Sequence, residues 1–275
     1  MAQKTIPRYA TIEKEVGETP LIATERLRAQ LTLSPEIPLA YAGRLDPMAS
    51  GKLLILIGDE CKHQEKYHTF DKEYRFSILF GMHTDTADVL GLAEACTVPD
   101  MLDSTLLKRA ARTFVGNISL PYPHYSSKTV KGKPLHTWTL EGRLSEIEIP
   151  VKASRVYRLS LDRIETIAPS PLFKNIHEKI DSIPPVTETS KALGRDFRRT
   201  EIHARWNEIE KSAHGAPYTI AHFTCIASSG TYMRSLAEMI AQAVGTCGLA
   251  YSIHRTKIGT YRPITKHWGF WSTSF

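Results

Sequence analysis

The chain has 275 residues, enough for one large domain or two smaller ones, and its 42% hydrophobic and 23% charged residues are normal for a globular protein. Its formal net charge is +6, and residues 101–160 hold ten Lys or Arg against four Asp or Glu. A basic excess concentrated in one segment favours a polyanionic partner such as a nucleic acid. No apolar run approaches the roughly 20 residues that cross a bilayer, and the opening residues lack the apolar stretch of a signal peptide. We therefore expect no membrane partner.

The cysteine spacing gives no sign of a metal centre. No two of the cysteines have C-x-x-C spacing, and no histidine lies at a metal-ligand interval from two of them. The four are Cys61, Cys96, Cys225 and Cys247. We therefore expect no metal, and a protein of a reducing compartment, the cytoplasm.

The N-terminal part predicts a helix, a turn and a buried strand. Helical spacing of apolar residues indicates a short helix over Thr24–Leu31. The unbroken apolar run Leu53–Ile57 is typical of a strand buried on both faces. Just before it, the polar turn Gly43–Pro47 places Asp46 on a loop held by a core strand, where catalytic groups are often found. The alternative is an ordinary turn in which Asp46 bonds its own backbone.

Two helices and a strand are expected next. Cys61–Phe70 could form a helix, and Lys72–Phe80 alternates like a strand with one face inward. That strand carries Tyr74, either a site residue or a core tyrosine. The Thr84-Asp85-Thr86 run that follows is typical of a capped turn. Asp100–Phe114 predicts a helix with Asp100 as its N-cap.

Residues 122–143 form a basic segment with interleaved aromatic residues. Three lysines surround or adjoin Gly132, and three aromatic or imidazole rings lie near them. The lysines are Lys128, Lys131 and Lys133, and the rings are those of Tyr125, His136 and Trp138. Such a loop suits phosphate contact and base stacking. A solvated surface loop is the alternative, because charge runs usually face water.

An additional segment separates two expected strands of the C-terminal half. The strands are Val151–Ile167 and Tyr218–Ser228, and a few residues would suffice to join them. The chain instead uses residues 169–217, which we interpret as an insertion, and the part LGRDFRRTEIHARWNEIEK has a helical pattern. Its basic residues are consistent with an element that contacts RNA or protein, or with a solvated face.

A glycine turn follows the second of these strands and leads into a helix. The turn Ser229–Arg234 precedes an apolar helical face that ends near Gly245. Arg234 then lies in the first helical turn, where a guanidinium can pair bidentately with a carboxylate or a phosphate. A surface arginine is the alternative. Ala250–Ile258 is a final expected strand.

Several segments resemble the TruB family of tRNA pseudouridine synthases and occur in the family's order. They are GRLDP-MASG with its strand, KEYRFSILFGMHTDTADVLG, YPHYSSKTVKGKPLHTWTLEGR, GTYMR and IHRTKIG. The resemblance implies an α+β fold with a central, mostly antiparallel sheet, flanking helices and an active-site cleft. Only 16 residues follow Gly259. We therefore expect one catalytic domain over 1–275, with the insertion at 169–217 and without the C-terminal PUA-type RNA-binding domain of many members.

The family's functional residues fall on definite positions of this chain. The resemblance implies that Asp46 is the nucleophile, attacking the sugar or the base, and that Arg234 pairs with it. It implies that Tyr74 stacks on the target base and that Thr256 lines the uracil pocket, while Tyr41 stands where histidine is usual. The expected contacts with the RNA backbone are Lys128, Lys131, Lys133 and Arg255.

The resemblance implies an enzyme without a cofactor that isomerises uridine to pseudouridine in the T-loop of tRNA (position 55), and we expect a monomer. The target nucleotide must be flipped out of the folded RNA. A catalytically inactive RNA-binding protein of the same fold, or a synthase acting on a different RNA uridine, remain alternatives. A further alternative is an unrelated hydrolase that uses Asp46 with a histidine, but none of the 11 histidines lies in a recognisable partner motif. One departure is that Lys14–Pro20 is a degenerate form of the family's usual opening segment.

Overall fold

The computed structural model describes residues 6–99, 102–185, 196, 198–213, 215–265 and 268–275. Its strands are β1 (Tyr9–Lys14), β2 (Leu39–Ala42), β3 (Ala49–Ile57), β4 (Asp71–Phe80), β5 (Met82–Thr84), β6 (Ala93–Ala95), β7 (Gly116–Pro121), β8 (Thr129–Val130), β9 (Lys133–Pro134), β10 (Val151–Ile167), β11 (Tyr218–Ala227), β12 (Gly248–Pro263) and β13 (Gly269–Ser274). Its α-helices are α1 (Pro20–Leu31), α2 (Gln64–His68), α3 (Ser104–Thr113), α4 (Leu135–Leu140), α5 (Pro169–Ser182), α7 (Arg199–Ser212) and α8 (Met233–Ala243). Short 3-10 turns are η1 (Gly58–His63) and η2 (Leu144–Glu146).

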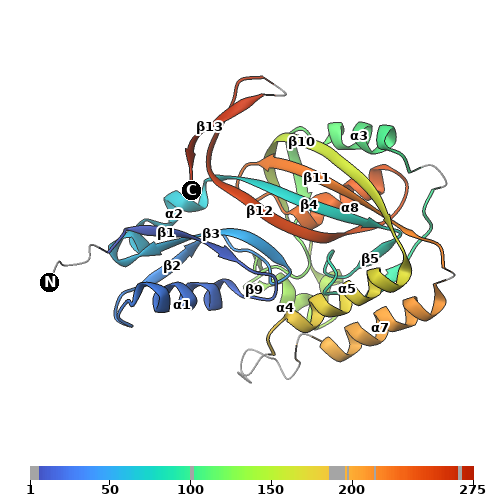
Figure 1. The fold of residues 1–275 in the computed structure, drawn as a ribbon, viewed down its shortest axis with the longest axis horizontal. Helices are drawn as coiled ribbons and strands as arrows, with labels where there is room; N and C mark the ends of the chain where they lie inside the picture. The colour runs from blue at the N-terminus through green and yellow to red at the C-terminus, as the bar shows by residue number, and fades with distance from the viewer. Residues whose placement is uncertain (1–5, 100–101, 186–195, 197, 214, 266–267) are drawn as a thin grey trace.

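One large sheet organises the molecule (Figure 1). Its strand order is β1-β3-β12-β4-β11-β10-β7, with β2 paired to β3 and β13 paired to β12. Every pairing is antiparallel except a short parallel one between Ile253–Arg255 of β12 and Ala49–Gly51 of β3. The predicted α+β fold with a mostly antiparallel central sheet is therefore confirmed. The parallel contact matters because it brings β12 beside the turn that precedes β3.

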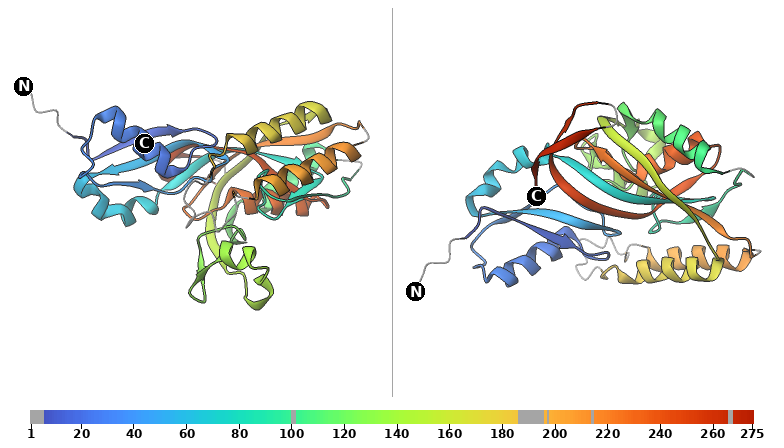
Figure 2. Two further views of the ribbon diagram at one scale, coloured as in Figure 1. Left: turned by 90° about the horizontal axis from the view of Figure 1, so that it is seen from below. Right: turned by 45° about the horizontal axis from the view of Figure 1, so that its top comes forward.

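Helices and a projecting segment surround this sheet. Helix α8 packs against β12 and β4, and α3 packs against β10. Helices α5 and α7 run side by side, and α1 accompanies β1, β2 and β3 (Figure 1). The segment that holds β8, β9 and α4 projects away from the body, as the left view of Figure 2 shows in green. The elements thus leave room for a cleft between the N-terminal strands, the projecting segment and the α5–α7 pair.

The apolar run of β3 divides its side chains between two cores. Leu53 and Ile55 pack with Leu27 of α1, whereas Leu54 and Leu56 pack on the other face with Tyr67 of α2. This is the period-two alternation of a strand. The prediction of a strand buried on both faces is confirmed. In β4, by contrast, the expectation of one inward face is wrong over Phe76–Phe80, where all five residues are buried.

Capping residues set the helix starts. Helix α1 begins at Pro20, earlier than predicted, because Thr19 Oγ1 accepts the Ile22 N–H at 3.2 Å and proline suits the first helical position. Helix α3 begins at Ser104 because Asp103 Oδ1 accepts the Leu106 N–H at 2.8 Å. The cap predicted at Asp100 lies outside the described residues. The helix expected over 61–70 is split between η1 and α2.

The segment 169–217 is a structural part of the core. Its described residues form α5 and α7 between the antiparallel neighbours β10 and β11. Phe173 and Ile176 of α5 and Trp206 of α7 are completely buried in the main core, and Trp206 Nε1 donates to Val89 O at 3.1 Å. The helices of this segment therefore contribute to the core, and the interpretation of the segment as an insertion stays a prediction. Residues 186–195, with Arg195 and the Ser/Thr-rich patch, lie outside the described part.

A disulfide joins two cysteines that the sequence spacing did not pair. Cys96 bonds to Cys247, with their Cα atoms 6.3 Å apart. This bond runs against the reducing compartment inferred from the spacing, and the cytoplasmic location stays a prediction. Among the described residues, no helix has both the length and the apolar character needed to cross a membrane.

Candidate active site

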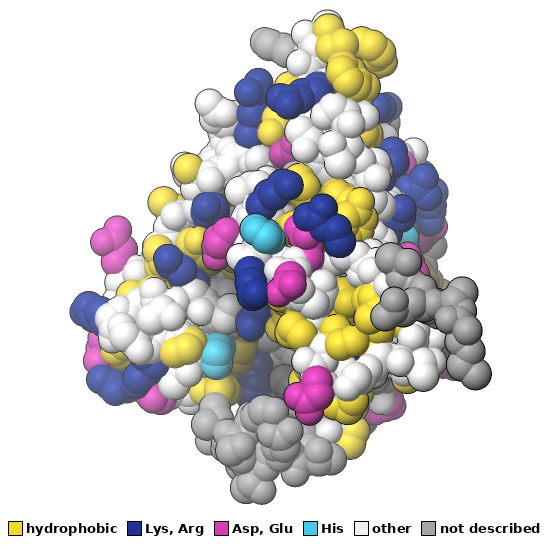
Figure 3. All heavy atoms as spheres, turned by 90° about the vertical axis from the view of Figure 1, so that its left-hand side faces the viewer, with side chains coloured by type: hydrophobic (Ala, Val, Ile, Leu, Met, Phe, Trp, Pro, Cys, Tyr) yellow, Lys and Arg dark blue, Asp and Glu magenta, His cyan; other side chains and the backbone are white. Residues whose placement is uncertain are grey.

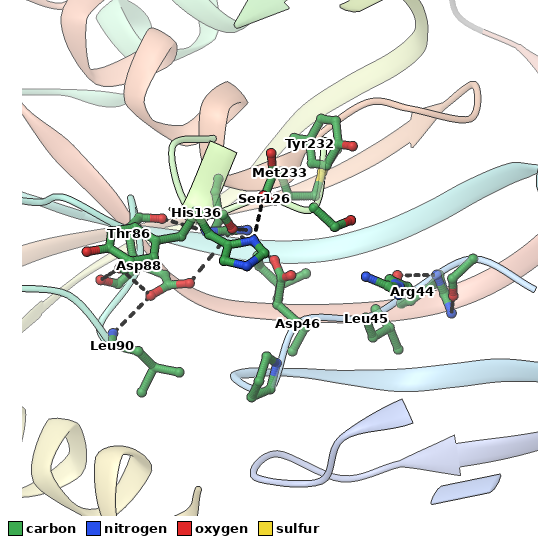
Figure 4. Close-up of a pocket in the computed structure, with 18 of the residues that line it drawn as sticks. Arg44, Leu45, Asp46, Thr86, Asp88, Leu90, Ser126, His136, Tyr232 and Met233 are labelled. Carbon is green, nitrogen blue, oxygen red and sulfur yellow. Dashed lines mark hydrogen bonds and ion pairs between the residues drawn. The ribbon is translucent and has the colours of Figure 1, made fainter. Parts of the chain in front are cut away.

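Asp46 projects from its turn into a cleft with a volume of about 1340 Å³ (Figure 4). Its neighbours Leu45 and Met48 are buried, so the turn is anchored on both sides of the carboxylate. The Asp46 side chain itself is 41% exposed. An anchored backbone with an accessible side chain is the arrangement that a nucleophile needs.

Two buried cations hold the backbone of this turn. Lys14 is fully buried, and its Nζ donates to Ala49 O at 2.6 Å and Pro47 O at 3.4 Å. Burial lowers the pKa of Lys14 to about 8. Arg255, on the adjacent strand β12, donates through Nη2 to Gly43 O at 3.1 Å and through Nε to Lys52 O at 2.7 Å. The degenerate opening segment therefore still supplies a functional contact through Lys14.

Two residues of β12 with predicted roles have partners within the protein. Arg255 lines the cleft but is 1% exposed, and its guanidinium donates to backbone carbonyls, so its contact with the RNA backbone stays a prediction. Thr256 Oγ1 donates to Glu73 Oε1 at 2.7 Å, and the residues of β12 that line the cleft are Ile253 and Arg255. The role of Thr256 in the uracil pocket stays a prediction.

Arg234 reaches Asp46 from the first turn of α8. Its Nε lies 2.8 Å from Asp46 Oδ2, an ion pair whose N–H is not aligned as a hydrogen bond. The two terminal nitrogens are fixed by backbone carbonyls: Nη1 donates to Thr86 O at 2.8 Å and Nη2 to Tyr125 O at 3.3 Å. Burial alone would lower the pKa of Arg234, but the charges of Asp46 and Asp88 raise it. Arg234 is therefore a fixed cation directed at the candidate nucleophile.

Asp88 is a second carboxylate at this arginine that the sequence reasoning missed. It is 3% exposed, and its Oδ2 lies 3.7 Å from Arg234 Nε. Its Oδ1 accepts Thr86 Oγ1 at 2.7 Å and the Leu90 N–H at 2.9 Å. Burial raises the pKa of Asp88, and Arg234 opposes that rise. The Thr-Asp-Thr run is indeed a capped turn, and the aspartate two residues beyond it was the available signal.

Two tyrosines contribute walls of the cleft. Tyr74 lies on β4 opposite Arg255, and Tyr41 lies on β2 opposite Ile55. Burial raises the pKa of Tyr74, so its hydroxyl keeps its proton near neutral pH, while Arg255 opposes the shift. A protonated, largely buried phenol ring offers an apolar face with a polar tip. Both positions are compatible with contact to a bound base.

The lysines of the projecting segment are partly engaged within the protein. Lys133 Nζ lies 2.7 Å from Glu141 Oε2 and 4.7 Å from the centre of the Trp138 ring, and Lys131 Nζ donates to Glu146 O at 3.0 Å. Trp138 is buried and donates to Val130 O, so it is not placed to stack on a base. The segment meets the cleft through Tyr125, Ser126, Ser127, His136, Thr137, Leu140 and Glu141. On the face seen in Figure 3, Lys and Arg side chains are interspersed with acidic and hydrophobic ones and form no single basic patch.

The architecture of the sheet places the chain among proteins with the pseudouridine synthase fold. It is similar to a chain in the solved structure described as "Crystal Structure of a Cbf5-Nop10-Gar1 Complex", with a TM-score of 0.52, 17% identity and coverage of 91% of this chain and 48% of that one. Residues 37–174 match the family model described as "TruB family pseudouridylate synthase (N terminal domain)". The chain belongs to this family.

Several relatives are tRNA pseudouridine synthases by name. The chain is 27% identical over 263 residues to tRNA pseudouridine synthase 4 of Saccharomyces cerevisiae, covering 87% of this chain and 64% of the relative. It is 26% identical over 250 residues to tRNA pseudouridine synthase B of Caldicellulosiruptor saccharolyticus, covering 91% and 67%. With the enzyme of the same name from Syntrophus aciditrophicus it is 34% identical over 124 residues, 45% of this chain and 39% of the relative. The chain thus matches between two fifths and two thirds of these relatives' lengths.

Proposed function

We propose that the protein is a tRNA pseudouridine synthase that isomerises a uridine in the T-loop of tRNA, at position 55, with Asp46 as its nucleophile. The observation that carries the proposal is the ion pair of Asp46 with Arg234, 2.8 Å apart in a cleft that Tyr74 also lines. Membership of the family and the names of the relatives support the reaction type. The single catalytic domain, the monomeric state and the cytoplasmic location remain predictions.

The reaction detaches uracil from C1′ of the ribose, turns the base and rejoins it through C5. The bond from C1′ to N1 breaks, the bond from C1′ to C5 forms, C5 loses its proton and N1 gains one. Asp46, as a carboxylate, attacks either the sugar or the base and leaves again when the new bond forms. Arg234, held by carbonyls at its two terminal nitrogens, keeps this carboxylate oriented through Nε. Tyr74 stacks on the flipped base and keeps it in the cleft during the rotation.

The cleft and the projecting segment together hold the RNA through their positively charged side chains. Lys128 is the strongest candidate of the three lysines, since its Nζ lies 5.5 Å from the centre of the Tyr122 ring, whereas Lys133 is paired with Glu141. Lys131 and Lys133 contribute to phosphate binding only by leaving the intramolecular partners described above. The cleft lining also includes the buried cations Lys72, Arg234 and Arg255, whose charge favours binding of a polyanion.

The proposal is tested with a tRNA transcript labelled with tritium at C5 of uridine. Tritium is released when C5 forms the new bond, and nucleoside analysis identifies pseudouridine. We expect release by the unsubstituted protein, none by Asp46→Asn, and full release by Asp59→Asn, a control because Asp59 is an exposed aspartate paired with Lys62. A transcript with cytidine at the T-loop target should remain unmodified.

Each failure has a definite meaning. Absence of product from the unsubstituted protein, with intact tRNA binding, would refute the enzyme and favour an RNA-binding protein of the same fold. Full activity of Asp46→Asn would refute the nucleophile. Continued release from the cytidine transcript would show that another uridine is the target.

A further inference from the structure

The α5–α7 pair forms a wall of the same cleft that contains Asp46. Ile180 and Ile183 at the end of α5 line the cleft, as do Arg198, Arg199 and Ile202 at the start of α7. The two arginines are adjacent in sequence but have different partners. Their contacts therefore show how this wall is attached to the rest of the site.

Arg199 links the start of α7 to the end of α5. Its Nη1 donates to Ile180 O at 2.5 Å and its Nη2 to Ile183 O at 2.7 Å, both at the end of α5. Its Nε lies 2.8 Å from Asp196 Oδ2. These contacts fix the start of α7 against α5, so that the position of Arg198 follows from the packing of the helices in the core.

Arg198 connects the helical pair to two loops of the site. Its Nη1 lies 2.5 Å from Asp85 Oδ2, and its guanidinium carbon lies 4.6 Å from the centre of the Tyr125 ring. The Arg198 side chain is only 12% exposed. A charged hydrogen bond and a cation–π contact made by one largely buried group hold both partners in place.

These two loops are the ones that orient Arg234. Thr86, next to Asp85, supplies the carbonyl for Arg234 Nη1, and Tyr125 supplies the carbonyl for Nη2. Asp85 also stabilises its own loop, since its Oδ1 accepts the Leu92 N–H at 2.9 Å. A continuous series of contacts therefore runs from Arg198 through both loops to Arg234, and from there to Asp46.

We propose that Arg198 is a positioning residue for the reaction: it joins the 84–88 and 122–127 loops so that their carbonyls direct Arg234 at Asp46. The part of this inference that concerns the reaction rate rests on the proposed function. Loss of the contact lets the two loops separate and Arg234 reorient, and a displacement of about 1 Å at a reacting group can cost on the order of 100-fold in rate.

The test compares Arg198→Ala, Arg198→Lys and Asp85→Asn with the control Arg205→Ala, which removes an exposed arginine of α7 paired with Glu208. Three quantities are measured: the single-turnover rate at saturating tRNA, the Kd for tRNA, and amide hydrogen exchange of peptides covering 84–92 and 122–127. We expect Arg198→Ala to slow the rate by roughly 10- to 100-fold with little change in Kd, and to speed exchange in both peptides. Arg198→Lys should recover part of the rate because it keeps the charge for Asp85, and Arg205→Ala should resemble the unsubstituted protein.

The double variant Arg198→Ala/Asp85→Asn gives a further check, because residues that act through one contact are not additive. Its rate should be no slower than that of Arg198→Ala alone. Asparagine retains an oxygen for the Leu92 N–H, so this change removes mainly the charge. If Arg198→Ala does not fold, Asp85→Asn and Arg198→Lys provide the same comparison.

Two results would overturn the inference: a rate within twofold of the unsubstituted protein with unchanged exchange, or a loss confined to Kd, which would make Arg198 an RNA contact. An inactive unsubstituted protein refutes the proposed function instead. The exchange measurement still decides whether Arg198 holds the two loops in that case.

Discussion

Replacing Arg234 by Met should destabilise the protein chiefly through Asp88. Asp88 is 3% exposed, and its Oδ2 lies 3.7 Å from Arg234 Nε. At an effective dielectric constant of about 20, a pair at this distance attracts by about 4 kcal/mol. Removing one partner of a buried pair typically costs about 3–5 kcal/mol, because the other charge stays buried. We expect the free energy of unfolding to fall by about 3 kcal/mol, near the lower end of this range, since Met recovers some packing.

The same reasoning predicts both a rescue and a pH dependence. Asp88→Asn keeps an oxygen for Thr86 Oγ1 and the Leu90 N–H, so Arg234→Met/Asp88→Asn should recover about 2 kcal/mol of the loss. The folded-state pKa of Asp88 is already raised by burial, and losing Arg234 raises it further. A carboxyl group whose folded pKa is raised loses stability as pH increases through that pKa, so the penalty of Arg234→Met is larger at about pH 8 than at about pH 5.

Urea unfolding at both pH values measures these effects for the unsubstituted protein, Arg234→Met, Asp88→Asn and the double variant. The unsubstituted protein sets the reference at each pH, and Asp88→Asn alone serves as the control for the loss of the carboxylate. Equal losses at the two pH values, or no recovery in the double variant, would show that Asp88 and Arg234 are not energetically coupled.

Four further predictions test other parts of the site. Lys14→Met should lower the single-turnover rate of tritium release by about 10-fold, because the carbonyls of Pro47 and Ala49 lose their donor while tRNA binding is retained; an unchanged rate would contradict the role of Lys14. Trp206→Ala should cost about 3–5 kcal/mol in urea unfolding, and a loss below about 1 kcal/mol would show that α7 is not part of the core. Thr256→Val should change the rate by less than about twofold, since Thr256 does not line the cleft; a large loss would support its predicted role. In a salt titration of tRNA binding, Lys128→Ala should reduce the slope of log K against log salt concentration by about 1. Lys133→Ala should reduce this slope by less, because Lys133 is paired with Glu141. Equal effects of the two substitutions would refute this distinction.

Local pattern was sufficient to predict the elements that present the main site residues. The apolar run before Gly58 predicted β3, and the glycine turn before Met233 predicted the start of α8. Both signals are local, because a buried strand and a strand–turn–helix junction are fixed by neighbouring residues. The resemblance then singled out Asp46 and Arg234 within these elements, and the structure brings the two together.

The roles of Arg255 and Thr256 could not be assigned from alternation. Strand β12 has an irregularity between Arg255 and Lys257, where its register with β4 shifts. A shift of one residue exchanges the faces to which side chains point. Arg255 therefore enters the protein beneath the GRLD turn, and Thr256 bonds to Glu73. Nothing in the local residue pattern marks the position of such a shift.

Contacts between distant segments were also beyond local pattern. Arg198 and Asp85 are 113 residues apart in sequence, and Arg234 and Thr86 are 148 apart. Each of these polar residues has an ordinary surface or turn role when its own neighbourhood is considered alone. Only the packing of α5 and α7 into the core places Arg198 beside the loops, and the sequence analysis noted the basic residues of this segment without its buried apolar ones.

Buried cations at the cleft are a second source of positive charge, beside the basic segment that the sequence shows. Four cations near the cleft are buried: Lys14, Lys72, Arg234 and Arg255. Burial, with Arg255 adding to it, lowers the pKa of Lys72 to about 8, and its Nζ donates to the carbonyls of His68 and Phe70. Since these charges are fixed by backbone carbonyls, they stabilise the walls and also create positive potential inside a concave site, where field lines are focused. Under the proposed function, this buried positive charge favours the entry of an RNA phosphate into the cleft, although Asp46 and Asp88 offset the charge of Arg234 itself.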